Sequence, residues 1–343
     1  MMRICWLLVF TLLTPGVFAV TVPLSTEARL EALHREALPA FWQEHAVEGE
    51  FAGKGGVPIR YAALRHPGSE RAIMVVNGRV ESYLKYQELA WDLWHQGYSL
   101  YLIDHRGQGR SGRLLSDPQK GYVEHFEDYV DDLKTFHDQI VLADKPASVF
   151  ILAHSMGGAI SARYLERWPA DIRAAVLSSP MLGINLGGLP AWLAKALATG
   201  IDTVGSWFGE PPYGPGQGSY EDHGFADNEL THSPLRYRLF REQYERTPEV
   251  KLGGATAHWI REGIQAGEQA IQGAGKIHTP LLLLQAGEDS VVDNAAQDAF
   301  CRAAPCEGGK PLRIEGAWHE LLIESDEKRQ QALAATLDFL RRY

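Results

Sequence analysis

Short runs of apolar residues alternate with stretches of helical periodicity over most of the chain. The apolar runs predict buried strands at residues 73–76, 99–103, 149–153, 174–177, 281–284 and 312–314. Apolar stripes at helical spacing predict helices over residues 83–94, 129–140, 159–168 and 332–340. Nearly continuous apolar strands that are separated by helices form parallel sheets covered on both faces. The pattern therefore predicts an α/β fold with a mostly parallel central sheet.

Two segments depart from this alternation. Between residues 48 and 65, a glycine-rich turn at 53–56 is followed by alternating apolar positions, which predicts an antiparallel hairpin. Residues 181–277 lack clean strands and contain apolar residues at helical spacing. We expect them to form a helical cap, inserted between a first part of the sheet domain (20–180) and a second part (278–343).

The expected cap contains a helical face with few charges around it. Leu189, Leu193, Leu197 and Ile201 recur at helical spacing, and Trp192 lies among them. Such a face either packs onto the core or meets lipid, and the sequence leaves both interpretations open. The second interpretation implies transient contact with a membrane surface.

One apolar run ends abruptly on Ser155. Ala153 and Gly157 stand two residues before and two residues after this serine. In a strand-to-helix elbow that mounts a nucleophile, these positions must be small so that the backbone can reverse and a substrate can approach. The usual pattern is G-x-S-x-G, and this chain has Ala153 at the first glycine. The elbow by itself is a weak signal, so its weight depends on partner residues.

The order of the expected strands points to those partners. A serine hydroxyl needs a base to take its proton and an acid to orient the base. In a fold with this elbow, the acid follows a late strand and the histidine follows the last one. Asp289 follows the strand at 281–284, and His319 follows the strand at 312–314. We therefore predict a catalytic triad of Ser155, Asp289 and His319.

Other titratable residues compete for these roles. Glu288 and Asp293 are alternative acids, but Asp289 follows its strand at the customary distance. His154 adjoins the nucleophile, and we expect its ring to point away along the elbow, in a structural role or as a contact near the site. His105 lies in a glycine-rich turn that lacks the lysine and serine or threonine ending of a phosphate loop, so a loop-shaping role is expected.

Acyl transfer also needs two donors for the developing oxyanion. These donors are usually the N–H after the nucleophile and one from the loop after an earlier strand. Met156 supplies the first, and Arg79, in the tight turn after the strand at 73–76, is the candidate for the second. Histidines are scattered and no H-E-x-x-H or paired C-x-x-C spacing is present, so no metal and no cofactor are expected.

The net charge limits the possible partners. The chain has 343 residues, of which 45% are hydrophobic, and a formal net charge of −10 at pH 7. Binding to nucleic-acid phosphates needs clustered lysines and arginines, and the sequence contains no run of them. We therefore expect no nucleic-acid partner, whereas the hydrophobic content suffices for a large core.

The first residues have the pattern of a secretory signal peptide. Arg3 precedes a mostly apolar stretch, and the segment ends on Val17-Phe18-Ala19, which fits a cleavage site with small residues. An uncleaved anchor is the alternative, but the stretch is shorter than the roughly 20 residues that span a bilayer. We expect residues 1–19 to be removed and the protein to be periplasmic or secreted, with membrane association as a further option. Cys301 and Cys306 then form an even pair in an oxidising compartment, which predicts a disulfide.

With these residues in place, the chain resembles the α/β-hydrolase superfamily from residue 48 to its end. Within it, the chain is similar to the bacterial lysophospholipase and monoacylglycerol lipase branch, which is also described as serine aminopeptidase-like. The segments that carry the resemblance are residues 77–82, 104–109, 153–158, 252–256, 289–292 and 316–320. Asn77-Gly78 differs from the His-Gly common in monoacylglycerol lipases and looks more like the lysophospholipase subgroup.

The resemblance implies hydrolysis of a carboxylic ester in a single-acyl lipid, with lysophospholipid as the first substrate and monoacylglycerol as the second. An amidase or iminopeptidase with the same triad is an alternative, but the mostly apolar cap favours an acyl chain over a free amino terminus. A binding protein without catalysis is disfavoured, because nucleophile, acid, base and oxyanion turn are all present in the required order.

Overall fold

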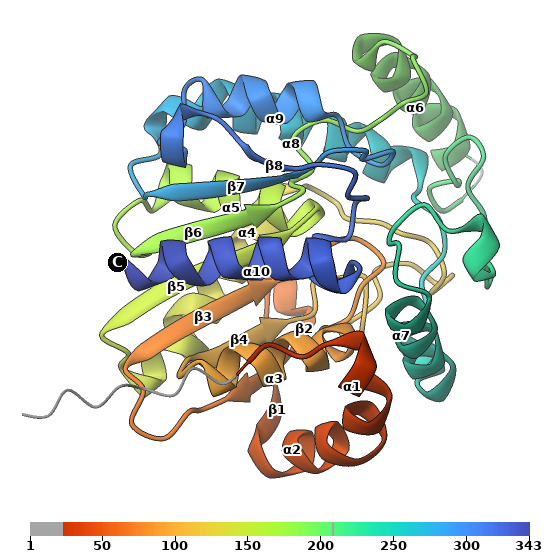
Figure 1. Cartoon of the computed structure of the whole chain (residues 1–343). Helices are drawn as coiled ribbons and strands as arrows, with labels where there is room; N and C mark the ends of the chain where they lie inside the picture. The colour runs from red at the N-terminus through yellow and green to blue at the C-terminus, as the bar shows by residue number, and fades with distance from the viewer. Residues whose placement is uncertain (1–22, 208) are drawn as a thin grey trace, which may run out of the picture.

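A sheet of eight strands runs through the middle of the molecule in this computed structural model, which describes residues 23–207 and 209–343 (Figure 1). Its strands are β1 (Ala46–Ala52), β2 (Pro58–Leu64), β3 (Arg71–Val76), β4 (Ser99–Ile103), β5 (Ser148–His154), β6 (Ala174–Ser178), β7 (Leu281–Ala286) and β8 (Leu312–Ile314). They lie in the order β1-β2-β4-β3-β5-β6-β7-β8. The predicted signal peptide, residues 1–19, lies outside the described residues.

The sheet is antiparallel only at one edge. β1 pairs with β2, and β2 with β4, in antiparallel register, while the other neighbouring strands are parallel. The hairpin predicted between residues 48 and 65 is the β1–β2 pair, in which Ala46 lies opposite Leu64. All residues of β4, β6 and β7 are buried, as the continuous apolar runs predicted, whereas edge strand β8 buries only Ile314.

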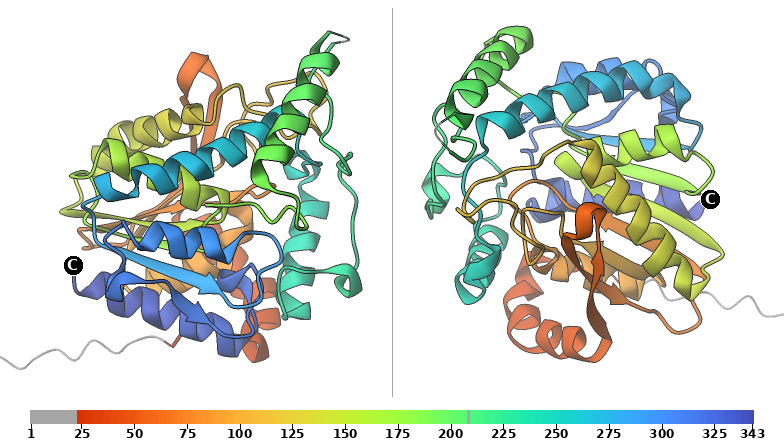
Figure 2. Two further views of the ribbon diagram at one scale, coloured as in Figure 1. Left: turned by 90° about the horizontal axis from the view of Figure 1, so that it is seen from above. Right: turned by 180° about the vertical axis from the view of Figure 1, so that it is seen from behind.

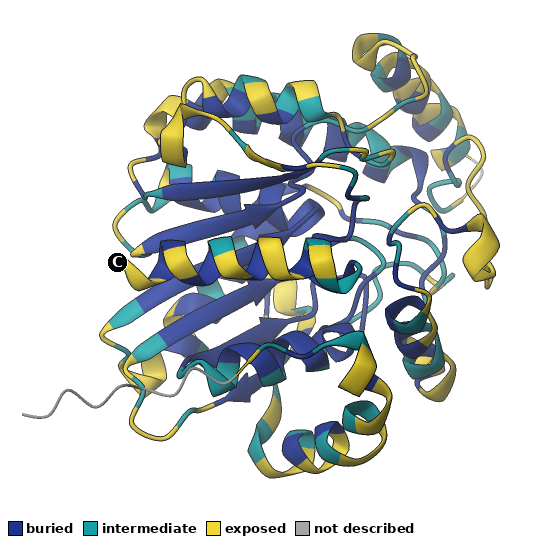
Figure 3. Cartoon of the chain, in the orientation of Figure 1, coloured by how far each residue is buried: buried dark blue, intermediate teal, exposed yellow. Residues whose placement is uncertain are grey.

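Helices cover both faces of the sheet (Figure 2). They are α1 (Glu27–Ala32), α2 (Leu38–His45), α3 (Gln87–His95), α4 (Glu127–Phe136), α5 (Met156–Arg167), α6 (Ala191–Ser206), α7 (Pro234–Arg246), α8 (Ala257–Gly273), α9 (Asn294–Cys301) and α10 (Asp326–Arg341). Residues of α4, α5, α8 and α9 share one core cluster, while α2, α3 and α10 contribute to a second. The sheet between them is buried throughout its centre (Figure 3). This arrangement confirms the predicted α/β fold.

The segment predicted as a cap contains three helices with different surroundings. α6 and α7 lie beyond the end of the sheet to which the parallel strands point (Figure 1). α8 also packs against α5 and α9, and its Ala266 and Ala270 belong to the main core. Gly267 lets α8 lie close to the backbone of Leu182, because a Cβ at this position would be only 2.5 Å from the Leu182 carbonyl oxygen. The inserted segment therefore includes one helix that packs against helices of the sheet domain and contributes to its core.

A buried arginine attaches α7 to the core. The Arg236 Nε atom donates to Glu88 of α3 at 3.0 Å, and its Nη2 atom donates to Asp326 of α10 at 2.8 Å. Arg236 is 3% exposed, so both partners compensate a charge that is removed from water. The orientation of α7 therefore depends on this ion-pair cluster.

A disulfide joins Cys301, at the end of α9, to Cys306. Both cysteines are buried. The carbonyl of Pro305, the residue before Cys306, accepts a hydrogen bond from the Leu281 amide of β7 at 3.2 Å. The structure thus places the two cysteines of the predicted pair in bonding contact beside the sheet.

Across the described ranges, 23–207 and 209–343, no helix combines the length and the apolar character needed to cross a membrane.

Candidate active site

Ser155 lies at a sharp turn between β5 and α5. Its φ and ψ angles are 49° and −116°, which places a residue with a side chain in the left-handed half of backbone space. Such conformations are unfavourable by about 1–3 kcal/mol and persist only where the surroundings impose them. Here the Ser155 N–H donates to the carbonyl of Ser178 at 3.0 Å, and the Met181 N–H donates to the carbonyl of Ser155 at 2.9 Å. The elbow is therefore held from the neighbouring strand β6.

The three residues predicted as a triad lie in one hydrogen-bonded chain. The Nε2 atom of His319 lies 3.0 Å from the Oγ atom of Ser155, and its Nδ1 atom lies 2.8 Å from the Oδ2 atom of Asp289. The side chains of His319 and Asp289 are 4% and 0% exposed. With the Nδ1 proton donated to Asp289, Nε2 is free to accept the proton of the serine hydroxyl.

Asp289 is held as a carboxylate. Burial acts to raise its pKa, but the hydrogen bond and charge of His319 and the amides of Val292 and Val291 outweigh burial, so the pKa lies below its ordinary value. The amides of Val291 and Val292 donate to Oδ1 at 2.8 and 3.0 Å, which leaves Oδ2 for His319. Asp289 can therefore orient the imidazole and stabilise its cation.

The two alternative acids, Glu288 and Asp293, make other contacts. Glu288 is exposed, and its backbone N–H donates to the carbonyl of Ala317. Asp293 precedes α9, and its Oδ1 atom accepts the Ala295 N–H at 2.8 Å as a helix cap. Within the described residues, neither side chain contacts His319.

The oxyanion turn is adjacent to the elbow because β3 and β5 are parallel neighbours. Val76, the last residue of β3, lies opposite Ala153. The first turn of α5 packs directly onto this strand end, since a Cβ at Gly157 would lie 2.1 Å from the Val76 carbonyl oxygen. The amides of Met156 and Arg79 have no hydrogen-bond acceptor in the described parts of the chain, so they remain available for an oxyanion.

The triad opens into a cavity of about 580 Å³. Arg79, His154, Ser155 and His319 line it on the side of the sheet. The apolar residues that line it are Val80, Met181, Ile184, Leu186, Pro215, Leu230, Ala255, Trp259, Ile260, Val291 and Val292. Most of these come from the segment inserted after β6, so the insertion gives the catalytic residues an apolar chamber.

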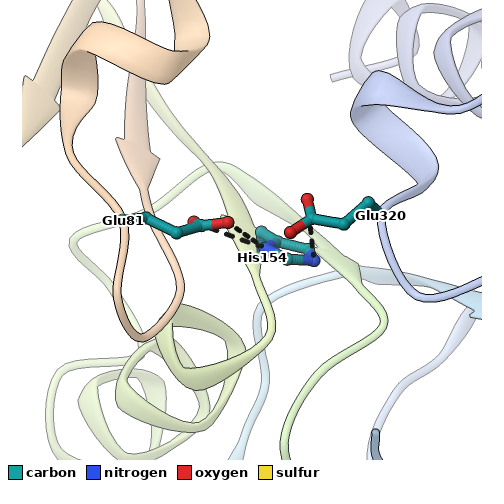
Figure 4. A group of neighbouring side chains, drawn as sticks. All are labelled: Glu81, His154 and Glu320. Atoms are coloured by element: carbon teal, nitrogen blue, oxygen red, sulfur yellow. Dashed lines mark hydrogen bonds and ion pairs between the residues drawn. The ribbon is translucent and has the colours of Figure 1, made fainter. Parts of the chain in front are cut away.

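His154 lies between two buried glutamates (Figure 4). Its Nδ1 atom is 3.3 Å from Glu81 and its Nε2 atom is 3.7 Å from Glu320. Its ring also lies 4.9 Å from the ring of His319, and the residue lines the cavity. The expected direction away along the elbow was therefore wrong, and of the two expected roles the contact near the site agrees with this position. The turn at Ser155 directs this side chain toward the loops that follow β3 and β8 instead.

Lys85 completes this cluster. Its Nζ atom lies 2.5 Å from Glu81 and 2.6 Å from Glu320, so one ammonium group bridges both carboxylates. Burial acts to lower the pKa of His154, but the charges of Glu320 and Glu81 outweigh it and raise that pKa above its ordinary value. Glu81, His154 and Glu320 offer atoms that a metal ion could use, but the Lys85 ammonium already bridges both carboxylates, and the raised pKa of His154 favours its cationic form beside them.

Sequence reasoning missed the charges around His154. Glu81 and Lys85 are four residues apart, which is a local signal, but Glu320 lies more than two hundred positions away and no motif connects it to them. His105 is buried, and its Nε2 atom is 3.2 Å from the carbonyl oxygen of Asn77. That contact holds the turn after β3, in keeping with a loop-shaping role.

A known protein family matches most of this chain. The family model described as serine aminopeptidase, S33, matches residues 68–326. The chain belongs to the S33 serine aminopeptidase family. Both the predicted family and the predicted α/β-hydrolase fold are thereby confirmed.

Relatives within the S33 family include named lipid hydrolases. Lysophospholipase L2 of Escherichia coli (strain K12) is 46% identical over 311 residues, which cover 89% of this chain and 90% of that protein. A monoacylglycerol lipase of Mycolicibacterium smegmatis is 27% identical over 283 residues, or 82% of this chain and 92% of that protein. The structure of a soluble variant of monoglyceride lipase from Saccharomyces cerevisiae has a TM-score of 0.65 at 18% identity, and covers 87% of this chain and 96% of that one. At this identity, the last comparison shows the common fold.

Removing the charge of Asp289 tests its role in this S33 family site. Asp289→Asn should lower kcat about 10⁴-fold, because an amide in this position favours the wrong tautomer of His319. The matched control is Glu288→Gln, which neutralises the exposed neighbouring acid and should leave kcat unchanged. Steady-state hydrolysis of a p-nitrophenyl ester measures both. A full loss in the Glu288 variant with activity retained in the Asp289 variant would reverse the assignment.

Proposed function

We propose that this chain is a lysophospholipase, which hydrolyses the carboxylic ester of a single-acyl phospholipid and releases a fatty acid. The observation that carries the proposal is the hydrogen-bonded chain Ser155–His319–Asp289 at the base of an apolar cavity. A single acyl chain fits the composition of the lining, and the name of the relative at 46% identity supports the same substrate class.

The geometry supports a two-step acyl transfer. His319 takes the proton of Ser155 as the oxygen attacks the ester carbonyl, and the N–H groups of Met156 and Arg79 stabilise the oxyanion. His319 then gives this proton to the departing glycerol oxygen, which leaves an acyl-enzyme. In the second step His319 takes a proton from a water molecule as its oxygen attacks the acyl carbonyl, and His319 then gives this proton to the departing Ser155 oxygen, so the fatty acid is released and the serine hydroxyl is restored.

Monoacylglycerol hydrolysis is the second candidate. The apolar lining of the cavity and the relative named monoacylglycerol lipase favour it, since the acyl chain and the ester are the same in both substrates. Aminoacyl amides are less suited to this site. The two glutamates that line the cavity are already neutralised by Lys85 and His154, so no free carboxylate is left there for an amino terminus.

Matched substrates test the proposed chemistry. Wild type should hydrolyse lysophosphatidylcholine and monoacylglycerol faster than aminoacyl amides, and Ser155→Ala should lower kcat about 10⁶-fold because the nucleophile is removed. Fatty-acid release measures the first two substrates and amine release the third. Wild-type turnover in the Ser155 variant would refute the mechanism, and a preference for the amides would replace the substrate class.

We also propose that the protein is exported. The support is the pattern of residues 1–19 together with the disulfide of Cys301 and Cys306, because disulfides persist in oxidising compartments. An enzyme in this location would meet lysophospholipids at the outer side of the cytoplasmic membrane or beyond it.

Mass spectrometry of the native protein tests export. The extracytoplasmic fraction should contain a chain that begins at Val20, and alkylation without reduction should leave Cys301 and Cys306 unmodified. An intact Met1 in the cytoplasmic fraction, with both of these thiols alkylated, would refute the proposal.

Finally, we propose that α6 contacts the membrane surface. It carries apolar side chains that are unusually exposed, since Trp192 is 69% and Trp207, directly after the helix, is 77% exposed (Figure 3). Leu197 and Val204 are half-exposed on the same element. A helix of this kind buries its apolar side chains in the lipid interface, and α6 lies near the segment that lines the cavity.

Removing the two exposed tryptophans tests this contact. Trp192→Ser combined with Trp207→Ser should weaken co-sedimentation with phospholipid vesicles by at least about tenfold, because the apolar area available for burial is lost. Hydrolysis of a soluble short-chain ester should stay unchanged. Val47→Ser, at an exposed apolar residue of β1, is the control and should not affect sedimentation. Equal sedimentation of all three proteins would refute the contact.

A further inference from the structure

The side chain of Arg79 is a charged group in the catalytic cavity that the mechanism above leaves unused. The mechanism needs only the backbone N–H of this residue. Arg79 is one of the residues that line the same cavity of about 580 Å³ as Ser155 and His319. The guanidinium lies against Trp259, with 5.1 Å between its central carbon and the ring centroid. It is therefore fixed at the cavity wall, on the residue that also supplies an oxyanion donor.

Arg79, which is partly buried, lacks the carboxylate partner that the buried arginines Arg106, Arg236 and Arg329 have. Its Nη2 atom donates to the carbonyl oxygen of Gly253 at 3.1 Å, and its buried Nε atom has no partner among the described residues. No carboxylate of the described chain lies within ion-pair distance of it. Burial lowers the pKa of the guanidinium to about 10, so the group is still a cation at neutral pH.

The contrast with other arginines is clear. Arg106 lies 2.6 Å from Asp132, Arg236 lies 2.9 Å from Glu88, and Arg329 lies 2.7 Å from Asp92. A charge removed from water is strongly unfavourable unless an opposite charge compensates it. Of these four arginines, only Arg79 has no carboxylate partner among the described residues, and it is the one that lines the catalytic cavity.

The surroundings of the guanidinium are shaped to hold it. A Cβ at Gly121 would lie 3.2 Å from the Nη2 atom, so the absence of a side chain at this position makes room for the arginine. Gly121 is paired with Ala255 in an isolated parallel bridge, and Ala255 also lines the cavity. Two loops from different parts of the chain thus meet around the guanidinium.

We propose that Arg79 determines specificity by binding the phosphodiester of a lysophospholipid. This inference rests on the proposed function and names the group that recognises its substrate. In a 1-acyl lysophospholipid the phosphate is separated from the ester carbonyl by one glycerol unit. The backbone N–H and the guanidinium of Arg79 are separated by the length of one arginine side chain. One residue can thereby serve the oxyanion through its amide and the phosphate through its side chain, because guanidinium groups form charge-assisted hydrogen bonds to phosphate oxygens. Monoacylglycerol has no anion to offer.

The test compares lysophosphatidylcholine with monoacylglycerol of the same acyl chain, in the same mixed micelles. Arg79→Gln should lower the ratio of the two kcat/KM values about 10- to 100-fold, the loss expected for a hydrogen-bonded charge pair. Any disturbance of the oxyanion amide acts on both substrates and cancels in the ratio. Arg79→Lys keeps the positive charge but lacks the planar guanidinium group, and it should lower the ratio less. Arg238→Gln, which removes a surface charge on α7, should leave the ratio unchanged.

A binding measurement gives an independent readout. Glycerophosphocholine should inhibit monoacylglycerol hydrolysis by wild type, and Arg79→Gln should weaken this inhibition by a similar factor. An unchanged ratio, or an equal fall for both substrates, would overturn the role of Arg79 while leaving the lysophospholipase proposal in place. A wild type that hydrolyses monoacylglycerol but neither hydrolyses lysophosphatidylcholine nor binds glycerophosphocholine would overturn both.

Discussion

The parallel register of β3, β5, β6, β7 and β8 is the constraint on which the site depends. Val76 lies opposite Ala153, Ala153 opposite Leu177, and Ala286 opposite Ile314, so the loops after these strands all leave the sheet at one edge. Carboxyl ends of neighbouring parallel strands meet there by geometry alone. Residues from four distant parts of the chain therefore need only short loops to form a triad and its oxyanion turn.

Backbone strain at Ser155 is the local counterpart of this arrangement. The left-handed φ of 49° directs the hydroxyl out of the elbow, and hydrogen bonds to Ser178 and from Met181 hold the turn in place. Gly157 is essential to the same geometry, since any side chain there would collide with the Val76 carbonyl. Burial of the sheet supplies the stability that sustains the unfavourable turn.

Charges near the nucleophile differ in how they are compensated. Glu81 and Glu320 are balanced by Lys85 and His154 within the fold, which makes that cluster a support for the loops around His319. Arg79 has no such balance, although it shares the cavity with them. A cavity with a largely apolar lining and one cation that lacks a carboxylate partner suits a ligand with one acyl chain and one anionic group.

The sequence by itself determined the parallel strands, the covering helices, and the loop positions of Ser155, Asp289 and His319, because burial periodicity and strand order are local and linear properties. Only the tertiary structure decided the orientation of His154, the link from Lys85 to Glu320 and the unpaired state of Arg79. It also decided that α8 packs against α5 and α9 of the sheet domain although it lies in the inserted segment. These features depend on which side chains meet across the fold. No periodicity along the chain encodes the absence of a partner, which becomes visible only when every neighbouring charge has been placed in space.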